Sequence, residues 1–499
     1  SEFKDLGKKL PLSEIDGINR HKLLIKNPKE DSVHYDLSLA LRSKLHPSRD
    51  PTIDYEGVVT ARFKYYQSLT KEVKPSTDTV NQANQPEQEI DCLTSQTHLF
   101  FDVYNYPVKV IVNEIEQSNI TVIDQKLFLA NDDLKTNGSQ NTVSIFFHGK
   151  YSNQGAGLHH YTDPTDQKEY LYTKFEPFEC HRMFPCFDQP NIKAVVNLKL
   201  LTPTKWKTFA NENEASSTIL SSEEKIKSEV SKVFSEDQRS FLIDSNLLVE
   251  KDYKLTVFKD THKISTYLIA LAVGEYVVFD NTSLPDFKVK MRVIYRDSLK
   301  QYQEAQEIIK ITIAGIEFYE EYFKIPYPFN KYDQIFVPEF QSGAMENVGL
   351  VTYNEFYVWK SPTTYRRKNG FAITVLHELS HMWFGNLATM NWWDDLWLNE
   401  AFATFISHLC MDKKLSQEFS LSWILFNYWK GFAYREDQLV TTHPVMGECK
   451  NTEVAETAFD SITYEKGSAL LKQIYYIVGY EKFSDAIHSY FAKHGFLNT

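Results

Sequence analysis

Cysteine is scarce in this chain, and the few cysteines it has are scattered. There are five among 499 residues, with no CxxC pair, which indicates neither a disulfide scaffold nor a thiolate zinc site. Cys180 and Cys186 could pair, but we expect reduced thiols. The 42% of hydrophobic and 14% of aromatic residues exclude global disorder, and the length favours two or three domains.

The chain also has no excess of positive charge and no long apolar run. The formal net charge is -12 and no basic stripe is present, which argues against a nucleic-acid binder. No run reaches the roughly 18 apolar residues that a membrane helix needs, and "YLIALAV" at 267–273 is predicted to be a buried strand. Without a secretory signal we expect a cytoplasmic protein. The opening "SEF" leaves a trimmed leader open, so a secreted protein or membrane-anchored ectodomain is the alternative.

The pattern of apolar residues divides the chain into two regions. After an N-terminal tail (1–19), residues 20–272 consist mostly of segments that alternate or run apolar with β-branched and aromatic side chains, which predicts a β-rich domain. Two polar insertions interrupt it. Residues 74–91 are predicted to be a long loop, and residues 216–241 a surface helix.

The second region has a helical pattern. From about residue 298, apolar residues follow a helical spacing up to the Pro-containing "KIPYPFN". A short strand region and two further helices come next. Residues 273–499 are therefore predicted to form an α+β domain.

The segment "TVLHELSHMWFGN" carries the strongest chemical signal. His377 and His381 are four residues apart, about 400° of helical rotation, so both imidazoles share one helix face and can bind one Zn²⁺. Glu378 lies beside them, where a base acting on a zinc-activated water is needed. Glu400, on the following helical segment, lies 19 residues after His381. Two histidines and one glutamate leave a coordination position open, which favours a catalytic zinc over a structural one.

These motifs occur in an order that resembles peptidase family M1, the aminopeptidase N-like zinc aminopeptidases. "GAMEN" precedes "HELSH", which is followed by "WFGNLATMNWWDDLWLNEAFATF"; "YTKFEPFECHRMFPCFDQP" and "FDSITYEKGSALL" extend the match to residues 30–499. The resemblance implies an N-terminal all-β saddle or sandwich domain followed by a thermolysin-like α+β zinc catalytic domain. It also implies that this domain continues past Thr499 into a C-terminal helical domain that the chain lacks.

The resemblance implies a role for each motif residue. His377, His381 and Glu400 would bind the zinc ion, Glu378 would be the general base, and the tyrosine of "FDSITYEKGS" would donate a hydrogen bond to the oxyanion. That tyrosine is Tyr464. The residues implied in substrate binding are Glu176, Gly343, Ala344, Met345, Glu346 and Asn347. Small residues would let the backbone pair with an extended peptide, and the carboxylates would hold its free ammonium group.

The other acidic and polar residues near the ligand Glu400 leave two interpretations open. Asn399, Asp394 and Asp395 could orient the zinc ligands or serve in a loop or helix cap. Thr404 stands where thermolysin-like endopeptidases carry an acid, which favours the M1 resemblance. The implied substrates are peptides with a free N-terminus.

Two alternatives compete with a simple aminopeptidase. A bifunctional relative would also open a lipid epoxide, but such relatives carry glycine where this chain has Ala344. An inactive scaffold or receptor would have lost a zinc ligand, the base or the amine-binding glutamate, and all of these are present in the sequence.

Overall fold

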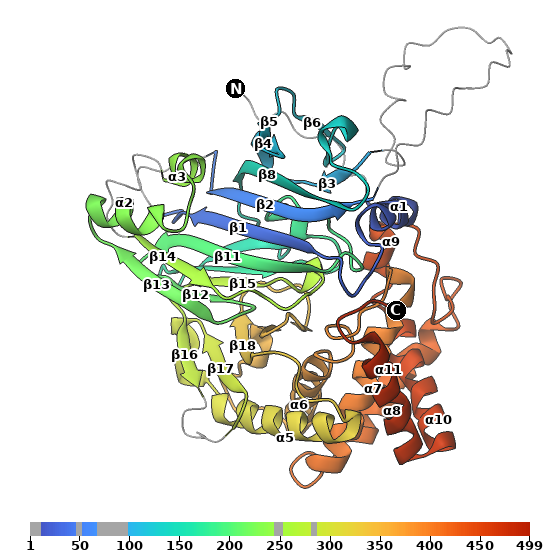
Figure 1. Cartoon of the computed structure of the whole chain (residues 1–499). Coiled ribbons are helices and arrows are strands. Elements are labelled where there is room, and N and C mark those ends of the chain that lie inside the picture. Colours follow the sequence, from blue (N-terminus) through green and yellow to red (C-terminus); the bar gives the residue numbers. More distant parts are fainter. Residues whose placement is uncertain (1–10, 46–51, 67–97, 244–252, 281–286) are drawn as a thin grey trace, which may run out of the picture.

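The structure is a computed structural model that describes five stretches of the chain: 11–45, 52–66, 98–243, 253–280 and 287–499. Figure 1 shows that the N-terminal half of the chain forms the sheets in the upper part of the view and that most of the helices of the C-terminal half gather below them. The insertion predicted at 74–91 lies outside the described residues, as do residues 1–10 of the predicted tail. A β-rich part followed by an α+β part confirms the predicted fold class.

The largest sheet has eight strands in the order β13-β14-β11-β1-β2-β8-β4-β5. Their bounds are β1 (Val33–Leu41), β2 (Tyr55–Tyr65), β4 (Tyr106–Val112), β5 (Ile115–Glu116), β8 (Ser139–Gly149), β11 (Ala194–Pro203), β13 (Glu214–Leu220) and β14 (Tyr253–Phe258). The pair β1 and β11 is parallel, whereas β1 and β2 are antiparallel. The alternating "SVHYDLSLAL" accordingly forms a central strand of this sheet.

Two smaller sheets complete the β-rich part. A four-stranded sheet has the order β12-β15-β10-β9 and a three-stranded sheet the order β3-β7-β6. Their bounds are β3 (Phe100–Asp102), β6 (Thr121–Ile123), β7 (Lys126–Phe128), β9 (Gly157–Thr162), β10 (Glu169–Lys174), β12 (Lys207–Ala210) and β15 (Leu271–Gly274). The strand predicted at 267–273 is shorter than expected, because η3 (Thr266–Leu268) is a 3-10 turn and β15 follows it.

The prediction of one surface helix at 216–241 is wrong in two respects. Its first residues belong to β13, and the rest forms two helices, α2 (Glu223–Ser231) and α3 (Glu236–Leu242). Each has a serine N-cap, so the serine-rich composition marks two helix starts. Ile226, Val230 and Leu242 pack in an apolar cluster on the large sheet. The helices therefore cover one of its faces.

The N-terminal segment also packs against the rest of the molecule. Helix α1 (Glu14–Leu24) starts inside the predicted tail and is capped by Ser13. The backbone N–H of Leu12 donates to Thr452 Oγ1 at 3.1 Å, and Leu12 is fully buried. This contact joins the start of the described chain to its helical part.

The α+β part is built on a five-stranded sheet of order β16-β17-β18-β20-β19. Its strands are β16 (Val277–Asp280), β17 (Lys290–Tyr295), β18 (Lys331–Val337), β19 (Ala344–Met345) and β20 (Leu350–Asn354). Strand β15 crosses the predicted domain boundary at residue 272, and this sheet begins shortly after it. The boundary itself stays a prediction.

Helices surround this sheet. They are α5 (Ala305–Phe323), α6 (Tyr365–Ser380), α7 (Trp397–Lys414), α8 (Ser422–Glu436), α9 (Thr452–Thr457), α10 (Gly467–Val478) and α11 (Tyr480–His494). The helix predicted from residue 298 is divided: η4 (Asp297–Tyr302) is a 3-10 helix, and α5 begins after a break. Helix α6 contacts both α5 and α7. The helix that carries "HELSH" therefore packs between these two helices.

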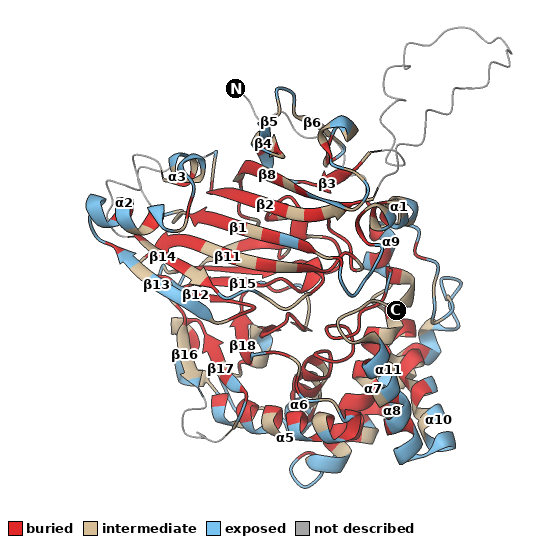
Figure 2. Ribbon diagram, in the orientation of Figure 1, coloured by how far each residue is buried: buried red, intermediate tan, exposed pale blue. Residues whose placement is uncertain are grey.

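One apolar core runs through both parts of the molecule. It extends from Leu12 to Phe491 and includes side chains of all the larger sheets, as the buried residues in Figure 2 show. Cys180, Cys186, Cys410 and Cys449 are buried free thiols, which confirms the expectation for the first two; Cys92 lies outside the described residues. Among the helices that the structure describes, none has the length and apolarity to cross a membrane.

Candidate active site

Helices α6 and α7 bring the predicted zinc ligands together. His377 and Glu378 lie in the last turn of α6, and His381 is its C-cap residue. Glu400 lies in the first turn of α7, which packs against α6. The His377 and His381 Nε2 atoms are 3.0 Å apart, and Glu400 Oε2 lies 3.2 Å from the first and 3.4 Å from the second.

This geometry fits a zinc ion. Tetrahedral zinc binds imidazole nitrogen and carboxylate oxygen at about 2.0–2.2 Å, so its ligand atoms stand roughly 3.3–3.6 Å apart. The separations of 3.0 to 3.4 Å among the three donor atoms are close to this range. All three side chains line one cavity. The donor set of two histidines and one glutamate is that of a catalytic zinc site.

Further contacts orient both imidazoles. His381 Nδ1 lies 2.9 Å from the Phe384 carbonyl oxygen. A carbonyl only accepts, so Nδ1 carries the proton and the Nε2 lone pair faces the site. His377 Nδ1 is 3.5 Å from Thr404 Oγ1. Thr404, which the sequence offered only as evidence against an endopeptidase, therefore also adjoins a predicted ligand.

A second acidic group lies beside the three donors. Glu176 and Glu346 come within 4.8 Å of Glu400, and all three carboxylates are buried. In the described stretches, Glu176 Oε1, Glu346 Oε1 and Glu378 Oε2 have no hydrogen-bond partner. Buried carboxylate oxygens without partners are costly unless a cation meets them. The three residues line a cavity of about 740 Å³ that could admit one.

Burial and mutual repulsion set the electrostatics of this cavity. Burial raises the pKa of Glu378 well above its ordinary value, and it does the same for Glu176, where Glu346 adds to the effect. Burial likewise raises the pKa of Glu346. Burial alone would raise the pKa of Glu400, but His381 and His377 lower it below its ordinary value. The ionised forms of Glu176, Glu346 and Glu378 are therefore unfavourable in this cavity unless a cation compensates them.

Tyr464 reaches the same cavity from a different element. It lies in η7 (Ile462–Lys466), a π-helical turn, and its ring stacks on that of His377 with the centroids 6.2 Å apart. Single π turns often occur at functional sites. Burial raises the pKa of Tyr464 well above its ordinary value. The phenol therefore stays a hydrogen-bond donor at neutral pH.

The "GAMEN" segment forms another part of the cavity wall, beside the predicted zinc ligands. Strand β19 pairs with β20 on one side and is the outermost described strand of its sheet. Gly343, Ala344 and Glu346 line the cavity. A Cβ atom at Gly343 would meet only the Tyr357 hydroxyl, at 3.6 Å. Packing within the protein therefore does not require glycine there.

Not every predicted residue lies in the cavity. The Met345 side chain is buried in the core, and Asn347 donates to Thr352 Oγ1 at 3.1 Å, so neither lines it. Asn399 donates to the Tyr267 hydroxyl at 3.3 Å. Asp395 accepts from the Trp397 indole at 3.2 Å. These contacts are structural ones.

Three residues at or near the site were not singled out from the sequence: Lys174, His443 and Asp460. Lys174 lines the cavity, and its position only two residues before the motif residue Glu176 could have revealed it. Asp460 accepts from the backbone N–H groups of Ile462 and Thr463, each at 3.0 Å, and lies 2.7 Å from His443 Nε2. It thus anchors the turn that carries Tyr464, a link that no spacing in the sequence indicates.

Comparison with known proteins agrees with this geometry. A helix bearing HExxH, with a glutamate from the next helix, is typical of zinc metallopeptidases. The profile of the Peptidase M1 N-terminal domain matches residues 31–239, and that of the Peptidase family M1 domain matches residues 308–499. The chain belongs to peptidase family M1.

Named relatives support the same assignment. The chain is 37% identical over 362 residues to "Aminopeptidase N" of Streptomyces lividans, covering 72% of this chain and 38% of that protein. It is 34% identical over 358 residues to "Tricorn protease-interacting factor F2" of Thermoplasma volcanium (71% and 40%). It is 31% identical over 361 residues to "Glutamyl aminopeptidase" of Rattus norvegicus (72% and 35%). The matched part thus spans about two fifths of each relative's length.

Proposed function

We propose that the protein is a zinc aminopeptidase that removes single residues from the free N-terminus of peptides. One observation carries the proposal. Three residues that could bind zinc and two buried carboxylates, Glu176 and Glu346, line the same cavity, and each of these two carboxylates keeps one oxygen without a hydrogen bond. The three residues account for peptide hydrolysis, and the carboxylates account for recognition of a chain end.

His377, His381 and Glu400 would hold one Zn²⁺. When bound, the ion supplies Lewis acidity that activates water and polarises the scissile carbonyl. Glu378 lies beside these ligands and its Oε2 has no hydrogen-bond partner among the described residues, which supports a role as the base that takes a proton from the attacking water. Glu378 then passes that proton to the nitrogen of the departing amine.

Tyr464 would stabilise the negative charge that develops on the carbonyl oxygen. It lines the cavity next to His377 and is held there by the turn that Asp460 anchors. A donor fixed before the reaction needs no reorganisation as the charge appears. Its contribution is therefore expected in the transition state more than in substrate binding.

The outer edge of β19 would bind the peptide backbone. An extended peptide can pair with an exposed strand edge, and the small residues Gly343 and Ala344 allow a close approach. Glu346 and Glu176 would then hold the peptide's ammonium group through charge-assisted hydrogen bonds. This arrangement fixes the distance between the N-terminus and the bond that is cut.

The decisive experiment compares free and blocked peptides. The zinc-loaded protein should cleave a peptide with a free N-terminus, fail on its N-acetylated form, and lose activity in a chelator and regain it with zinc. Glu346→Ala should lose far more exopeptidase activity than bound zinc. Equal cleavage of acetylated peptides would indicate an endopeptidase, and activity insensitive to the chelator would refute the zinc mechanism. Hydrolysis of a lipid epoxide would support the bifunctional alternative.

The helical part also exposes large apolar side chains on α8 and α10, and one of them, Trp429, lines the cavity. Ile424, Tyr428 and Trp429 of α8 are 64%, 45% and 43% exposed, and Ile474 and Ile477 of α10 are 47% and 82% exposed. Such exposed apolar side chains mark an interaction surface. We propose that a C-terminal helical domain, as the M1 resemblance implies, covers it and limits access to the cavity. A longer chain should bind an apolar-surface dye less than this one does.

A further inference from the structure

Lys174 places an ammonium group among the carboxylates of the cavity. It is the last residue of β10, its side chain is 12% exposed, and it lines the cavity. Its Nζ atom donates to the backbone carbonyl of Glu176 and lies 3.8 Å from Glu176 Oε2. The proposed function assigns no role to this ammonium group.

The position of Lys174 relates it to one part of a substrate. In an amino acid, the ammonium nitrogen and the side chain are attached to the same Cα atom. If Glu176 and Glu346 hold the ammonium, the side chain of the first residue must emerge close to that point. Lys174 Nζ, 3.8 Å from a Glu176 oxygen, is then within its reach. The first residue's side chain therefore meets a positive charge.

Other cations of the cavity lie too far along α6 to serve the same purpose. Arg366 stacks on Tyr428 at 4.2 Å and Arg367 on Trp359 at 5.9 Å. Arg366 precedes His377 by 11 residues, which corresponds to about 16 Å along a helix. Among the described Lys and Arg residues of the cavity, Lys174 is therefore the one near the side chain of the substrate's first residue. The two arginines adjoin another part of the cavity.

We propose that Lys174 determines specificity, so that the enzyme prefers peptides whose first residue is glutamate or aspartate. This inference rests on the proposed function of the site. An acidic side chain gains a charge-assisted contact with the Lys174 ammonium, while lysine or arginine is repelled. An alanine or leucine side chain gains neither effect. Such contacts correspond to about a tenfold to a hundredfold preference.

The test measures ratios of kcat/KM over a panel of aminoacyl substrates that carry glutamate, aspartate, alanine, leucine, lysine or arginine. In the zinc-loaded protein, Lys174→Gln should lower the glutamate-to-alanine ratio about tenfold to a hundredfold. Lys174→Arg should preserve most of it, and Lys174→Glu should favour the basic substrates. Lys227→Gln, which removes an equal charge from an exposed ion pair on α2, is the matched control and should change no ratio.

The outcomes separate this inference from the proposed function. A ratio that stays within twofold in Lys174→Gln, while alanine is still released, overturns the specificity role and leaves the aminopeptidase standing. A purely structural role for Lys174 would slow all substrates equally, and that result would overturn the specificity role too. If no substrate is hydrolysed, the proposed function fails. Calorimetric titration of the zinc-loaded protein with L-glutamate and L-alanine then decides, since a preference unchanged by Lys174→Gln overturns the inference.

Discussion

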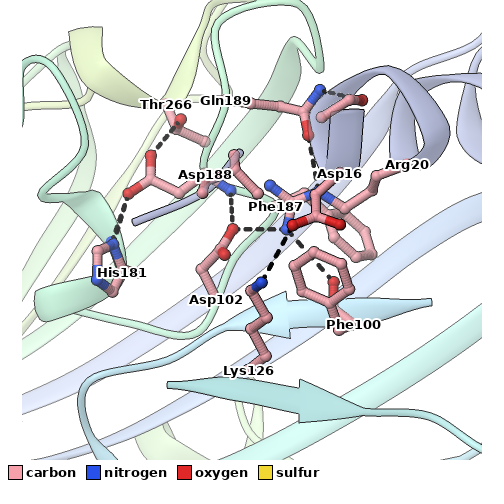
Figure 3. A network of polar contacts seen from close by, with 12 residues as sticks. Asp16, Arg20, Phe100, Asp102, Lys126, His181, Phe187, Asp188, Gln189 and Thr266 are labelled. Atoms are coloured by element: carbon pink, nitrogen blue, oxygen red, sulfur yellow. Dashed lines mark hydrogen bonds and ion pairs between the residues drawn. The ribbon is translucent and has the colours of Figure 1, made fainter. Parts of the chain in front are cut away.

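The molecule contains two buried clusters of charged side chains, and they are built differently. In the β-rich part, Arg20 donates to Asp102 Oδ2 at 2.6 Å and to Gln189 Oε1 at 2.7 Å (Figure 3). In the same network, His181 Nδ1 lies 2.9 Å from Asp188 Oδ2. Each carboxylate in this network has a cationic or donor partner within the chain. Among the buried side-chain nitrogens and oxygens of this network, only Arg20 Nη2 lacks a hydrogen-bond partner in the described residues. We call this the closed cluster, because its carboxylates are compensated within the chain.

The cluster in the cavity is open by contrast. Glu176, Glu346 and Glu378 each keep one oxygen that no donor in the described residues reaches. Burial raises the pKa values of all three. Their ionised forms are stable there only if cations from outside the chain compensate them. Two cations, a zinc ion and a peptide ammonium, would do so, and the difference between the clusters thus separates a structural role from a functional one.

The largest effect is expected from the base. Glu378→Gln keeps the shape of the side chain but cannot accept a proton, so kcat should fall about 10²- to 10⁴-fold while the zinc content is retained. Rate measurements and metal analysis of the same sample check this. Glu418→Gln, an exposed change, is the control. A variant that keeps half of its activity would place the base elsewhere.

The closed cluster should show its importance in stability instead. Asp102→Ala leaves Arg20, which is 1% exposed, as an uncompensated buried charge. The free energy of unfolding should fall by about 3–5 kcal/mol. Denaturant titration measures the change, and Glu223→Gln, which breaks an exposed pair on α2, should change it by less than about 1 kcal/mol. Equal losses in the two variants would show that the cluster near Arg20 is not energetically special.

Tyr464→Phe should separate transition-state stabilisation from substrate binding. The change removes one hydroxyl next to His377 and leaves the stacked ring in place. We expect kcat to fall about 10²- to 10³-fold with KM nearly unchanged. The control is Tyr434→Phe on an exposed face of α8. A loss confined to KM would make Tyr464 a binding residue.

The sequence predicts the open cluster better than the closed one, for a physical reason. His377 and His381 are tied by the helical period, and the "GAMEN" and "HELSH" motifs carry the M1 resemblance, so the site residues could be named before any coordinates. The contacts of Arg20 with Asp102 and Gln189 join residues 82 and 169 positions apart. No local period encodes such distances. Lys174 stayed hidden because a lone lysine is ordinarily a solvated surface residue.

The smallest expected effect is a pH dependence of stability that comes from Glu346 in the open cluster. In zinc-free protein, burial raises the pKa of Glu346; His381 opposes this shift and Glu400 adds to it. Between the ordinary value and the raised one, the folded state binds more protons than the unfolded state, so stability should fall as the pH rises through this range. At a pH above this range, each unit by which the pKa is raised lowers the free energy of unfolding by about 1.4 kcal/mol.

Glu346→Gln should remove this dependence and stabilise the zinc-free protein at pH 8 by about 1 kcal/mol, even though it weakens peptide binding. Thermal unfolding over pH 5 to 8, with and without a chelator, measures both slopes. Zinc should reduce the gain, because the bound ion already compensates part of the negative charge. If Glu346→Gln destabilised the zinc-free protein as strongly as Asp102→Ala does, both clusters would be structural, and the open oxygens would lose their meaning as a binding site.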